Sequence, residues 1–346
     1  MGFDRIIALD LGKFNSVCCT TDVATQQHRF GSIATTPQAM HDFLVARIEA
    51  GDAPSRTLVV FESCDVAGWL HDLAVALGFE VKVANCCHEA WKWNKVKRKT
   101  DKDDALKLAK MATLDQLPVV HMPSPQMRQR RRLVLQRRTL VQRRTQIKNS
   151  IRSIFSQQGL TQLLPRGKKA WSKAGIAQLR EQAKDLAGCE IDDLWRGGLH
   201  VEIELLEALS TQVAIVEKKL DQIGEADEQV KLLQTVNGVG PRLAEAVVTT
   251  LDDPHRFQGA AEVSSYAGLV PRLIESGTMS RVGRITRRGP SLLRGMLIEV
   301  AWVVWRKNPW AQAFVTKVSR GMKSSVAPSS SSPRTRVKPR SAGAEG

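Results

Sequence analysis

The seven residues RIIALDL (5–11) limit the folds that this chain can adopt. Side chains alternate between the two faces of a strand, and here both faces are apolar, since Ile6 lies on one face and Ile7 on the other. Such a run is typical of a central strand covered on both sides. Strand-like segments recur at SVCCTTDV, HRFGSIAT, TLVVFES and EVKVAN, with a helical segment, GWLHDLAVALGF, before the last. This order predicts an α/β layer with a mixed sheet, in which the first two strands form a hairpin.

Two acidic residues interrupt the apolar strands. Asp10 shares a strand face with Ile6 and Ala8, and Glu62 ends the apolar run LVVFE. A charged carboxylate in such surroundings costs free energy unless something pairs with it. One acid of this kind is often structural, but two in comparable settings favour a shared cation.

The segment KTDKDDALKLAK (99–110) adds three aspartates. Thr100 suits the N-cap of a helix, and Asp103 completes a variant of the capping box. Asp101 and Asp104 then share one helical face. Either these two bind metal, or all three aspartates merely favour the helix N-terminus through its dipole. With the two strand acids, they would make four oxygen donors suited to Mg²⁺ or Mn²⁺ and to phosphoryl transfer with two metals.

The excess of positive charge predicts a polyanionic partner. The chain has 51 Lys and Arg against 35 Asp and Glu, a net charge of +16, which favours nucleic acid. No apolar run approaches the roughly 20 residues of a membrane span. The N-terminus, MGFDRIIALDLGK, does not resemble a signal peptide. We therefore expect no membrane partner and a cytoplasmic location.

Residues 126–155 contain no acidic residue, and their apolar residues recur at helical spacing. This pattern predicts a long helix with an apolar seam and a basic face. A second helical stretch, 199–222, could pair with it as an antiparallel coiled coil. The arginine pairs of the basic face are candidates for nucleic-acid contact: Arg131, Arg132, Arg137, Arg138, Arg143 and Arg144.

Residues 228–320 are predicted to form a compact, mostly helical unit. The stretch KLLQTVNGVGPRLAEAVVTTL (231–251) has the pattern of a helix-hairpin-helix, in which backbone amides around Gly238 and Gly240 would contact a phosphate. An ordinary helical hairpin is the alternative.

The stretch 264–290 is rich in Gly, Ser and Arg. A serine in a flexible glycine loop could attack a phosphodiester while guanidinium groups absorb the developing charge. Alternatively, the loop binds backbone phosphates and its serines have no chemical role. Tyr266 is a rival nucleophile, although its ring suits packing beside the apolar AGLV. The cationic candidates of this loop are Arg281, Arg284, Arg287 and Arg288.

Taken together, the motifs ALDLGK, VVFES, KTDKDDALKLA, NGVGP and YAGLVPRLIESGTMSRVGRITRRGP, in this order over residues 4–320, resemble the insertion sequence 110 family of transposases. These are DEDD recombinases guided by a bridge RNA. DLGKFNS also resembles the first phosphate loop of actin-like ATPases, but the chain has no second loop of the DxGGT type.

The resemblance implies an α/β RuvC-like (RNase H-type) N-terminal domain, a long helical coiled-coil middle and a mostly α C-terminal domain with a helix-hairpin-helix. We assign these to residues 1–122, 123–227 and 228–322. Residues 323–346 are Ser/Pro/Arg-rich and read as a disordered tail, where the family would continue with an apolar helix. This departure suggests a frame change near Lys323.

The resemblance also implies the chemistry and the partners. The metal-binding tetrad would be Asp10, Glu62, Asp101 and Asp104, with Mg²⁺ or Mn²⁺, and the nucleophile would be Ser276, with Ser280 and Thr278 as alternatives. The product of strand cleavage would be a 5′-phosphoserine link to DNA. Partners would be the element ends, the target DNA and a guide RNA, with a homodimer or tetramer acting in the bacterial cytoplasm. The alternatives are a RuvC-like junction endonuclease that uses water and a non-catalytic nucleic-acid-binding protein.

Overall fold

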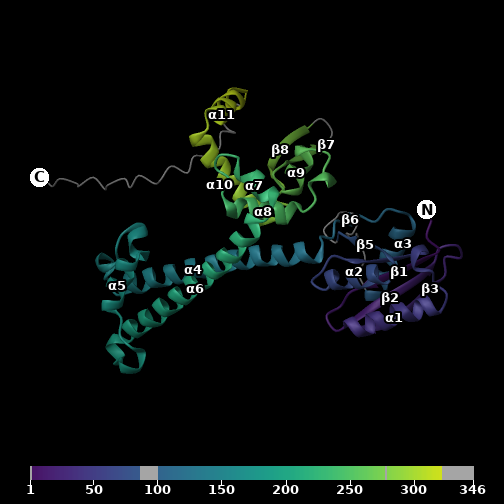
Figure 1. Cartoon of the computed structure of the whole chain (residues 1–346), viewed down its shortest axis with the longest axis horizontal. Coiled ribbons are helices and arrows are strands. Elements are labelled where there is room, and N and C mark those ends of the chain that lie inside the picture. Colours follow the sequence, from purple (N-terminus) through teal and green to yellow (C-terminus); the bar gives the residue numbers. More distant parts are fainter. Residues whose placement is uncertain (1, 86–99, 277–278, 322–346) are drawn as a thin grey trace, which may run out of the picture. The chain divides into compact units, whose positions relative to one another are not determined.

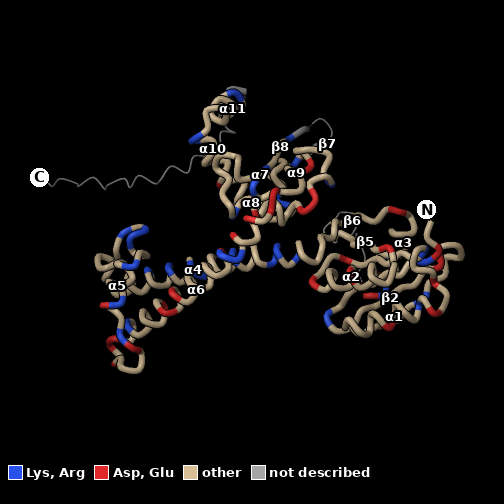
Figure 2. The backbone as a smooth tube through the Cα atoms, viewed as in Figure 1, with Lys and Arg blue, Asp and Glu red and all other residues tan. Residues whose placement is uncertain are grey.

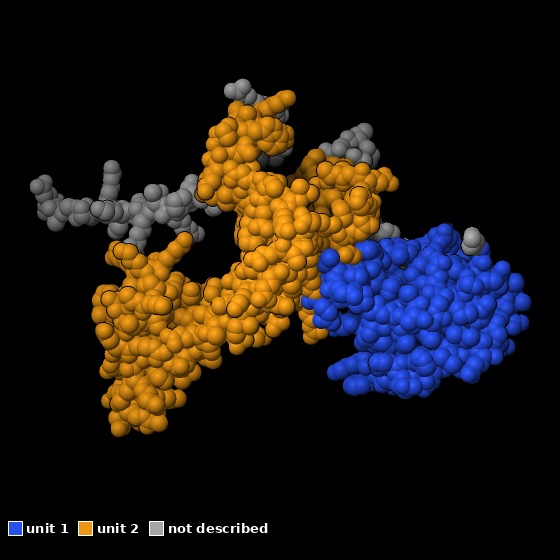
Figure 3. All heavy atoms as spheres, in the orientation of Figure 1, with its two compact units in different colours: residues 1–129 blue, residues 130–346 orange. Residues whose placement is uncertain are grey.

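A computed structural model of the chain describes residues 2–85, 100–276 and 279–321 and divides into two compact units, residues 1–129 and 130–346 (Figure 3). The side chains of residues 274–280, 320 and 321 lie outside the described part, as do the predicted tail and frame change near Lys323. The finer division into three domains stays a prediction. The two units are described separately below.

The first unit is built on a six-stranded mixed sheet with the order β3-β2-β1-β4-β5-β6. The first strand is antiparallel to the second and parallel to the fourth, which confirms the predicted hairpin and the mixed sheet. The strands are β1 (Arg5–Asp10), β2 (Asn15–Asp22), β3 (His28–Ala34), β4 (Thr57–Glu62), β5 (Glu80–Ala84) and β6 (Val119–Val120).

Helices cover both faces of this sheet (Figure 1). On one face, α1 (Pro37–Glu49) and α2 (Ala67–Ala76) pack against the Ile7 side of β1. On the other, α3 (Asp101–Thr113) packs against the Ile6 side. Both faces of β1 are therefore buried, as its continuous apolar run predicts.

Most of α4 (Pro125–Gln157) belongs to the second unit, where it packs beside α6 (Leu194–Glu225) in the antiparallel direction. Near one end of the pair Val134 shares a core with Leu220, and near the other Phe155 shares a core with Leu199. We call residues 130–225 the arm. Its far end holds α5 (Lys173–Gln182) and short 3-10 turns at Thr161–Leu163, Gly167–Trp171, Leu186–Gly188 and Ile191–Asp193. Coiled-coil geometry in the strict sense stays a prediction.

The remainder of the second unit is mostly helical, as predicted. Residues 264–290 differ from the expected flexible loop, because they contain a two-stranded antiparallel hairpin, in which Leu273 and Val282 are paired. The β-branched residues Ile274, Val282 and Ile285 favour strands in this stretch. The elements are α7 (Glu228–Gln234), α8 (Pro241–Leu251), α9 (Ala260–Tyr266), β7 (Pro271–Ser276), β8 (Met279–Ile285), α10 (Ser291–Lys307) and α11 (Pro309–Gly321).

In the described part of the chain, no helix combines the length and the apolar character that crossing a membrane requires.

Candidate functional site

Asp10 and Glu62 are the last residues of two neighbouring parallel strands. The register pairs Leu9 of β1 with Phe61 of β4, so the next residue of each strand is an acid at the same edge of the sheet. Both acids are half-buried. Because strand side chains alternate, both belong to the face against which α3 packs.

The helix α3 begins with the predicted capping box. The Thr100 hydroxyl accepts a hydrogen bond from the Asp103 backbone N–H (3.4 Å), and the Thr100 backbone N–H donates to Asp103 Oδ2 (3.0 Å). Hydrogen bonds from the Thr100 side chain and backbone lower the pKa of Asp103. The prediction that Asp103 caps the helix is confirmed.

The direction of α3 brings its N-terminus toward the two strand acids. Ala112 and Thr113, at its C-terminal end, line one pocket together with Ile6 near the start of β1, and Ala105, closer to its N-terminus, packs on the same face of the sheet. From Ala112 back to Asp101 the helix rises about 16 Å, and from Ile6 to Asp10 the strand extends about 13 Å. The first turn of α3 and the carboxylate edge of the sheet therefore lie at the same end of the unit.

Asp104 and Asp101 differ in burial at this end. Asp104 is 8% exposed and belongs to the helix face that packs on the sheet, whereas Asp101 is exposed. Carboxylate oxygens are the donors that Mg²⁺ and Mn²⁺ prefer, so the residue types fit such ions. Within the described residues, no three His, Cys, Asp or Glu side chains are gathered closely enough to form a ready-made metal site. This end of the unit thus provides carboxylate oxygens suited to metal binding, but the described side chains do not form a complete coordination sphere.

The turn between β1 and β2 brings an aromatic residue to the same edge, and this residue is absent from the predicted site. Phe14 is 73% exposed, and the Nζ atom of Lys13 lies 5.1 Å from the centroid of its ring. A Cβ atom on Gly12 would come 2.2 Å from the backbone oxygen of Asn15, so this tight turn requires glycine. The signal in the sequence was a large aromatic residue inside a turn that follows an acid.

Ser276 is the last residue of β7, where the register pairs it with Met279 of β8. Ser280 is paired with Glu275, and Thr278 lies outside the described residues. The predicted nucleophile thus belongs to the tip of the hairpin rather than to a loop.

Two glycines, one at each end of this hairpin, lie close to the backbone of the opposite end. Gly268 and Gly289 both have positive φ, +69° and +87°. A Cβ atom on Gly268 would come 1.9 Å from the Arg288 backbone oxygen, and one on Gly289 would come 2.0 Å from the Tyr266 backbone oxygen. The side chain of Arg294, on α10, donates to the Ala267 backbone oxygen (3.1 Å). The two ends of the hairpin are therefore in backbone contact that leaves no room for side chains, and the Arg294 side chain joins this root to α10.

The four arginines predicted around the loop are exposed. Arg281 and Arg284 belong to β8, while Arg287 and Arg288 follow it. Arg287 has φ +56° and donates its backbone N–H to the Gly268 oxygen (3.1 Å), so it forms part of the hairpin root.

The turn between α7 and α8 contains the two predicted phosphate-binding glycines. Both are exposed, and Gly240 is the N-cap of α8. Gly238 has φ +97°, and a Cβ atom there would come 3.1 Å from a methyl group of Val304 on α10. The backbone of Gly238 therefore lies against α10, and the helix-hairpin-helix stays a prediction.

Three of the six arginines predicted on the basic face are engaged within the protein. Arg131 donates to the backbone oxygens of Thr249 (2.6 Å) and Thr250 (3.3 Å) at the end of α8, and burial lowers its pKa. Arg137 binds Glu217 (2.7 Å). The remaining contact joins Arg138 to the Ser291 hydroxyl (3.2 Å).

The other three stay available to a ligand. Arg132 and Arg143 are exposed and Arg144 is half-buried. Across the described ranges, no salt bridge includes any of them. Figure 2 shows Lys and Arg along α4 and at the far end of the arm.

Arg130, absent from the predicted set, has the most extensive ionic contacts of α4. Its Nε and Nη2 atoms donate to the two carboxylate oxygens of Glu245, each at 3.0 Å, and Nη1 donates to Asp227. These partners lie far away in sequence, which explains why periodicity alone did not single out this arginine.

Comparison with protein families gives two matches along the chain. Residues 230–316 match a family described as transposase, IS116/IS110/IS902 family. Residues 7–159 match a second family, described as transposase and named for DEDD transposases of IS110.

Individual relatives have related descriptions. The chain is 26% identical over 331 residues to the transposase for insertion sequence element IS1111A of Coxiella burnetii, covering 92% of this chain and 84% of that protein. A probable family 20 transposase of Pseudomonas aeruginosa is 33% identical over 29% of this chain and 30% of its own length. A pilin gene-inverting protein of Moraxella bovis is 31% identical over 28% of this chain and 30% of its own length.

Proposed function

The chain belongs to the IS116/IS110/IS902 family of insertion-sequence transposases, and on that premise we propose that it cleaves and exchanges DNA strands through a covalent serine intermediate. The observation that carries metal-dependent cleavage is the register of β1 and β4, which ends two adjacent parallel strands on Asp10 and Glu62; the serine intermediate follows from the resemblance to the family. The first turn of α3 supports it by adding acids at the same end of the unit. The residues we assign to the reaction are Asp10, Glu62, Asp101, Asp104 and Ser276.

The carboxylates would act by holding divalent cations against the DNA. Mg²⁺ or Mn²⁺, when bound, would stabilise charge on the attacking and leaving oxygens of the phosphodiester. The half-buried Asp10 and Glu62 and the buried Asp104 occupy fixed elements, which favours a defined site. The exposed Asp101 would complete the donor set as the DNA binds.

Strand cleavage would be a transesterification. The Ser276 hydroxyl oxygen attacks the phosphorus, its proton passes to a base, and the bond from phosphorus to the 3′ oxygen breaks. The products are a 5′-phosphoserine link and a protonated 3′-hydroxyl. Attack by a 3′-hydroxyl of another strand reverses these steps, so strand exchange needs no external energy source. The exposed arginines of the hairpin would stabilise the negative charge that develops on the phosphate oxygens.

We further propose that a bridge RNA selects the DNA and that two or more copies of the chain act together. Binding of a polyanion to the arm is supported by three arginines whose positive charge no described carboxylate neutralises: Arg132, Arg143 and Arg144. Contacts between phosphate groups and backbone amides at Gly238 and Gly240 would contribute binding without base specificity.

The test is covalent capture of a cleaved strand. A DNA fragment that carries the element end is labelled at the 3′ end of the strand downstream of the cleavage point and incubated with the protein and Mg²⁺. We expect the label to stay on the protein after denaturation, to be lost in EDTA and to be lost in Ser276→Ala.

The matched control is Ser280→Ala, which should retain the adduct. An adduct that persists in Ser276→Ala would contradict the assignment of the nucleophile. Cleavage without any adduct would instead support the junction endonuclease that uses water.

A further inference from the structure

The far end of the arm contains a cavity of about 390 Å³ between α4, α5 and α6. Its apolar wall is formed by Trp171, Ile176 and Leu206, and cationic side chains, among them Lys148 and Lys173, line it as well. An aromatic wall beside cations is the combination that single-stranded nucleic acids use for binding, because a base stacks while its phosphate is neutralised.

Trp171 is held in place before any ligand arrives. It ends the 3-10 turn Gly167–Trp171, and the next residue, Ser172, is the N-cap of α5. The Ser172 hydroxyl accepts from the Gly175 backbone N–H (3.2 Å) and donates to the Lys169 backbone oxygen (2.8 Å). A Cβ atom on Gly175 would come 2.2 Å from that same oxygen, so turn and helix are in close backbone contact. Such a fixed ring loses little entropy when a base stacks on it.

The cations around Trp171 lack matching negative charge. Lys148 Nζ lies 5.1 Å and Arg152 Cζ 5.0 Å from the centroid of the indole ring. No ion pair of the described residues includes Lys148, Arg152 or Lys173. The chain itself has no Asp or Glu between Asp115 and Glu181.

Glu207, the acid that lines the cavity, is already paired with Arg180 (2.7 Å). Arg180 also binds Glu204 (2.8 Å), so one net negative charge stays on that side of the cavity against the three cations around Trp171. Burial, together with the positive charges of Arg144 and Arg152, lowers the pKa of Lys148. A bound anion would relieve this repulsion.

We propose that the cavity binds one unpaired nucleotide of a single-stranded nucleic acid, with the base against Trp171 and a phosphate beside Lys148 and Lys173. This inference rests on the proposed function only in that the protein handles nucleic acid, and it requires neither metal nor the carboxylate tetrad. Duplex DNA does not meet the requirement, because its bases are stacked inside the helix and cannot enter a pocket.

The test measures binding without catalysis. The full chain, carrying Asp10→Asn and kept in EDTA, is titrated with fluorescent twelve-nucleotide oligomers of uridine, of thymidine and with a duplex. We expect Trp171→Ala to weaken single-strand binding roughly tenfold and to leave duplex binding unchanged. The double variant Lys148→Gln/Lys173→Gln should weaken it too and reduce the log–log salt slope by about 0.7, because one phosphate is no longer neutralised.

Two controls separate the site from a general loss of structure or charge. Trp171→Phe keeps an aromatic ring and should retain most of the affinity, and the exposed Lys218→Gln/Lys219→Gln on α6 removes the same charge elsewhere. Ultraviolet crosslinking of the uridine oligomer should label the peptide that contains Trp171.

Comparison of the ribose and deoxyribose oligomers identifies the strand, since the one that loses more affinity in Trp171→Ala is the preferred ligand. Equal single-strand affinity in all variants would overturn the proposal, and it is the result expected if the cavity binds a helix of a protein instead. A loss of duplex affinity in Trp171→Ala as large as the loss of single-strand affinity would overturn it too. Loss of strand cleavage in the tetrad variants would leave these binding results unaffected, so the two proposals fail independently.

Discussion

Arg130 and Glu245 form a bidentate ion pair, with two hydrogen bonds of 3.0 Å that join residues 115 positions apart. The Glu245 side chain is 2% exposed and that of Arg130 12%. Asp227 accepts from the same guanidinium. This pair fastens the start of the arm to α8, the helix that follows the glycine turn.

Removing one partner of this pair should destabilise the second unit strongly. Arg130→Met would leave Glu245 buried without its cation, which typically costs about 3–5 kcal/mol of unfolding free energy. The double variant Arg130→Met/Glu245→Met should be less destabilised than the sum of the singles. Urea unfolding, with hydrogen exchange of α8 amides to identify the unit, measures both. Additive losses would mean that the two side chains are not coupled.

Asp227 should make the stability of this unit sensitive to acid. Burial raises the pKa of Asp227, but hydrogen bonds from Arg130 and from the backbone N–H groups of Val230 and Gln229 outweigh it, so the pKa lies below its ordinary value of 3.8. A lowered folded-state pKa contributes stability that is present above the unfolded pKa and is lost as the pH falls through the folded pKa. Stability should therefore fall below about pH 4, and Asp227→Asn should be less stable at pH 7 and flatter in acid. An unchanged acid profile would contradict this role.

Substitution of the neighbours Asp103 and Asp104 should have different effects, because we assign helix capping to the first and metal binding to the second. Asp104→Asn removes a proposed ligand and should reduce Mg²⁺-dependent cleavage by at least about a hundredfold. Asp103→Asn disturbs only the capping box, at a cost of about 1 kcal/mol in stability, and should retain cleavage. Gel assays of a labelled element end, with thermal melts of both variants, provide the comparison. Equal activity in the two variants would remove Asp104 from the site.

The basic helix should contain arginines of two kinds. Arg143→Gln/Arg144→Gln should reduce the log–log salt slope of duplex binding by about 1.8, or about 0.9 for each phosphate contact, without lowering the melting temperature. Arg131→Gln should instead destabilise the protein, because it leaves the carbonyl groups at the end of α8 without their donor. Fluorescence titrations at several salt concentrations and calorimetry distinguish them. A lower melting temperature in the Arg143/Arg144 variant would contradict the division.

The hairpin that carries Ser276 should depend on glycine at its root. Gly289→Ala introduces a Cβ atom 2.0 Å from the Tyr266 oxygen at a residue with φ +87°, so the hairpin must shift, and adduct formation should fall at least about tenfold. Gly295→Ala, in the open middle of α10, meets nothing within 4 Å and should stabilise the helix by up to about 1 kcal/mol. If both variants formed the adduct at the wild-type rate, the root would not position the serine.

Local patterns predict the elements that need only local information. The apolar run around Ile7 predicts β1 because both faces of that strand are covered, and Thr100 with Asp103 predicts the start of α3 because a capping box closes within four residues. The contrast between Asp103 and Asp104 follows from helix geometry in the same way.

Contacts between distant segments could not be predicted in this way. The arginine pairs of α4 look equivalent in sequence, yet Arg131 binds the end of α8 while Arg143 faces solvent. The difference depends on which helix packs where. The β7–β8 hairpin was missed because its strands lack the apolar alternation of a half-buried strand and are rich in Gly, Ser and Arg. Phe14 was missed because only the folded turn reveals that its ring is exposed at the carboxylate edge.

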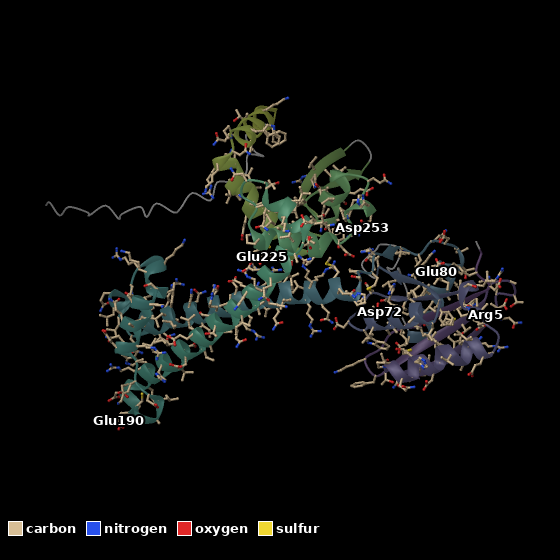
Figure 4. All side chains as sticks on the ribbon, in the orientation of Figure 1. Arg5, Asp72, Glu80, Glu190, Glu225 and Asp253 are labelled. Atoms are coloured by element: carbon tan, nitrogen blue, oxygen red, sulfur yellow. The ribbon has the colours of Figure 1, made fainter. Side chains whose placement is uncertain are left out.

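The labelled side chains in Figure 4 include Glu225, the last residue of the arm, two positions before Asp227. Asp227 binds Arg130, the first residue of the arm, so this ion pair holds the two ends of the arm together. Its length is therefore a parameter that evolution can change independently of the rest. Matched insertion or deletion of seven residues in α4 and α6 would alter its reach by about 10 Å while both ends stay fastened. Relatives can diverge in arm length, and thus in the span of nucleic acid they contact, without redesigning the chemistry.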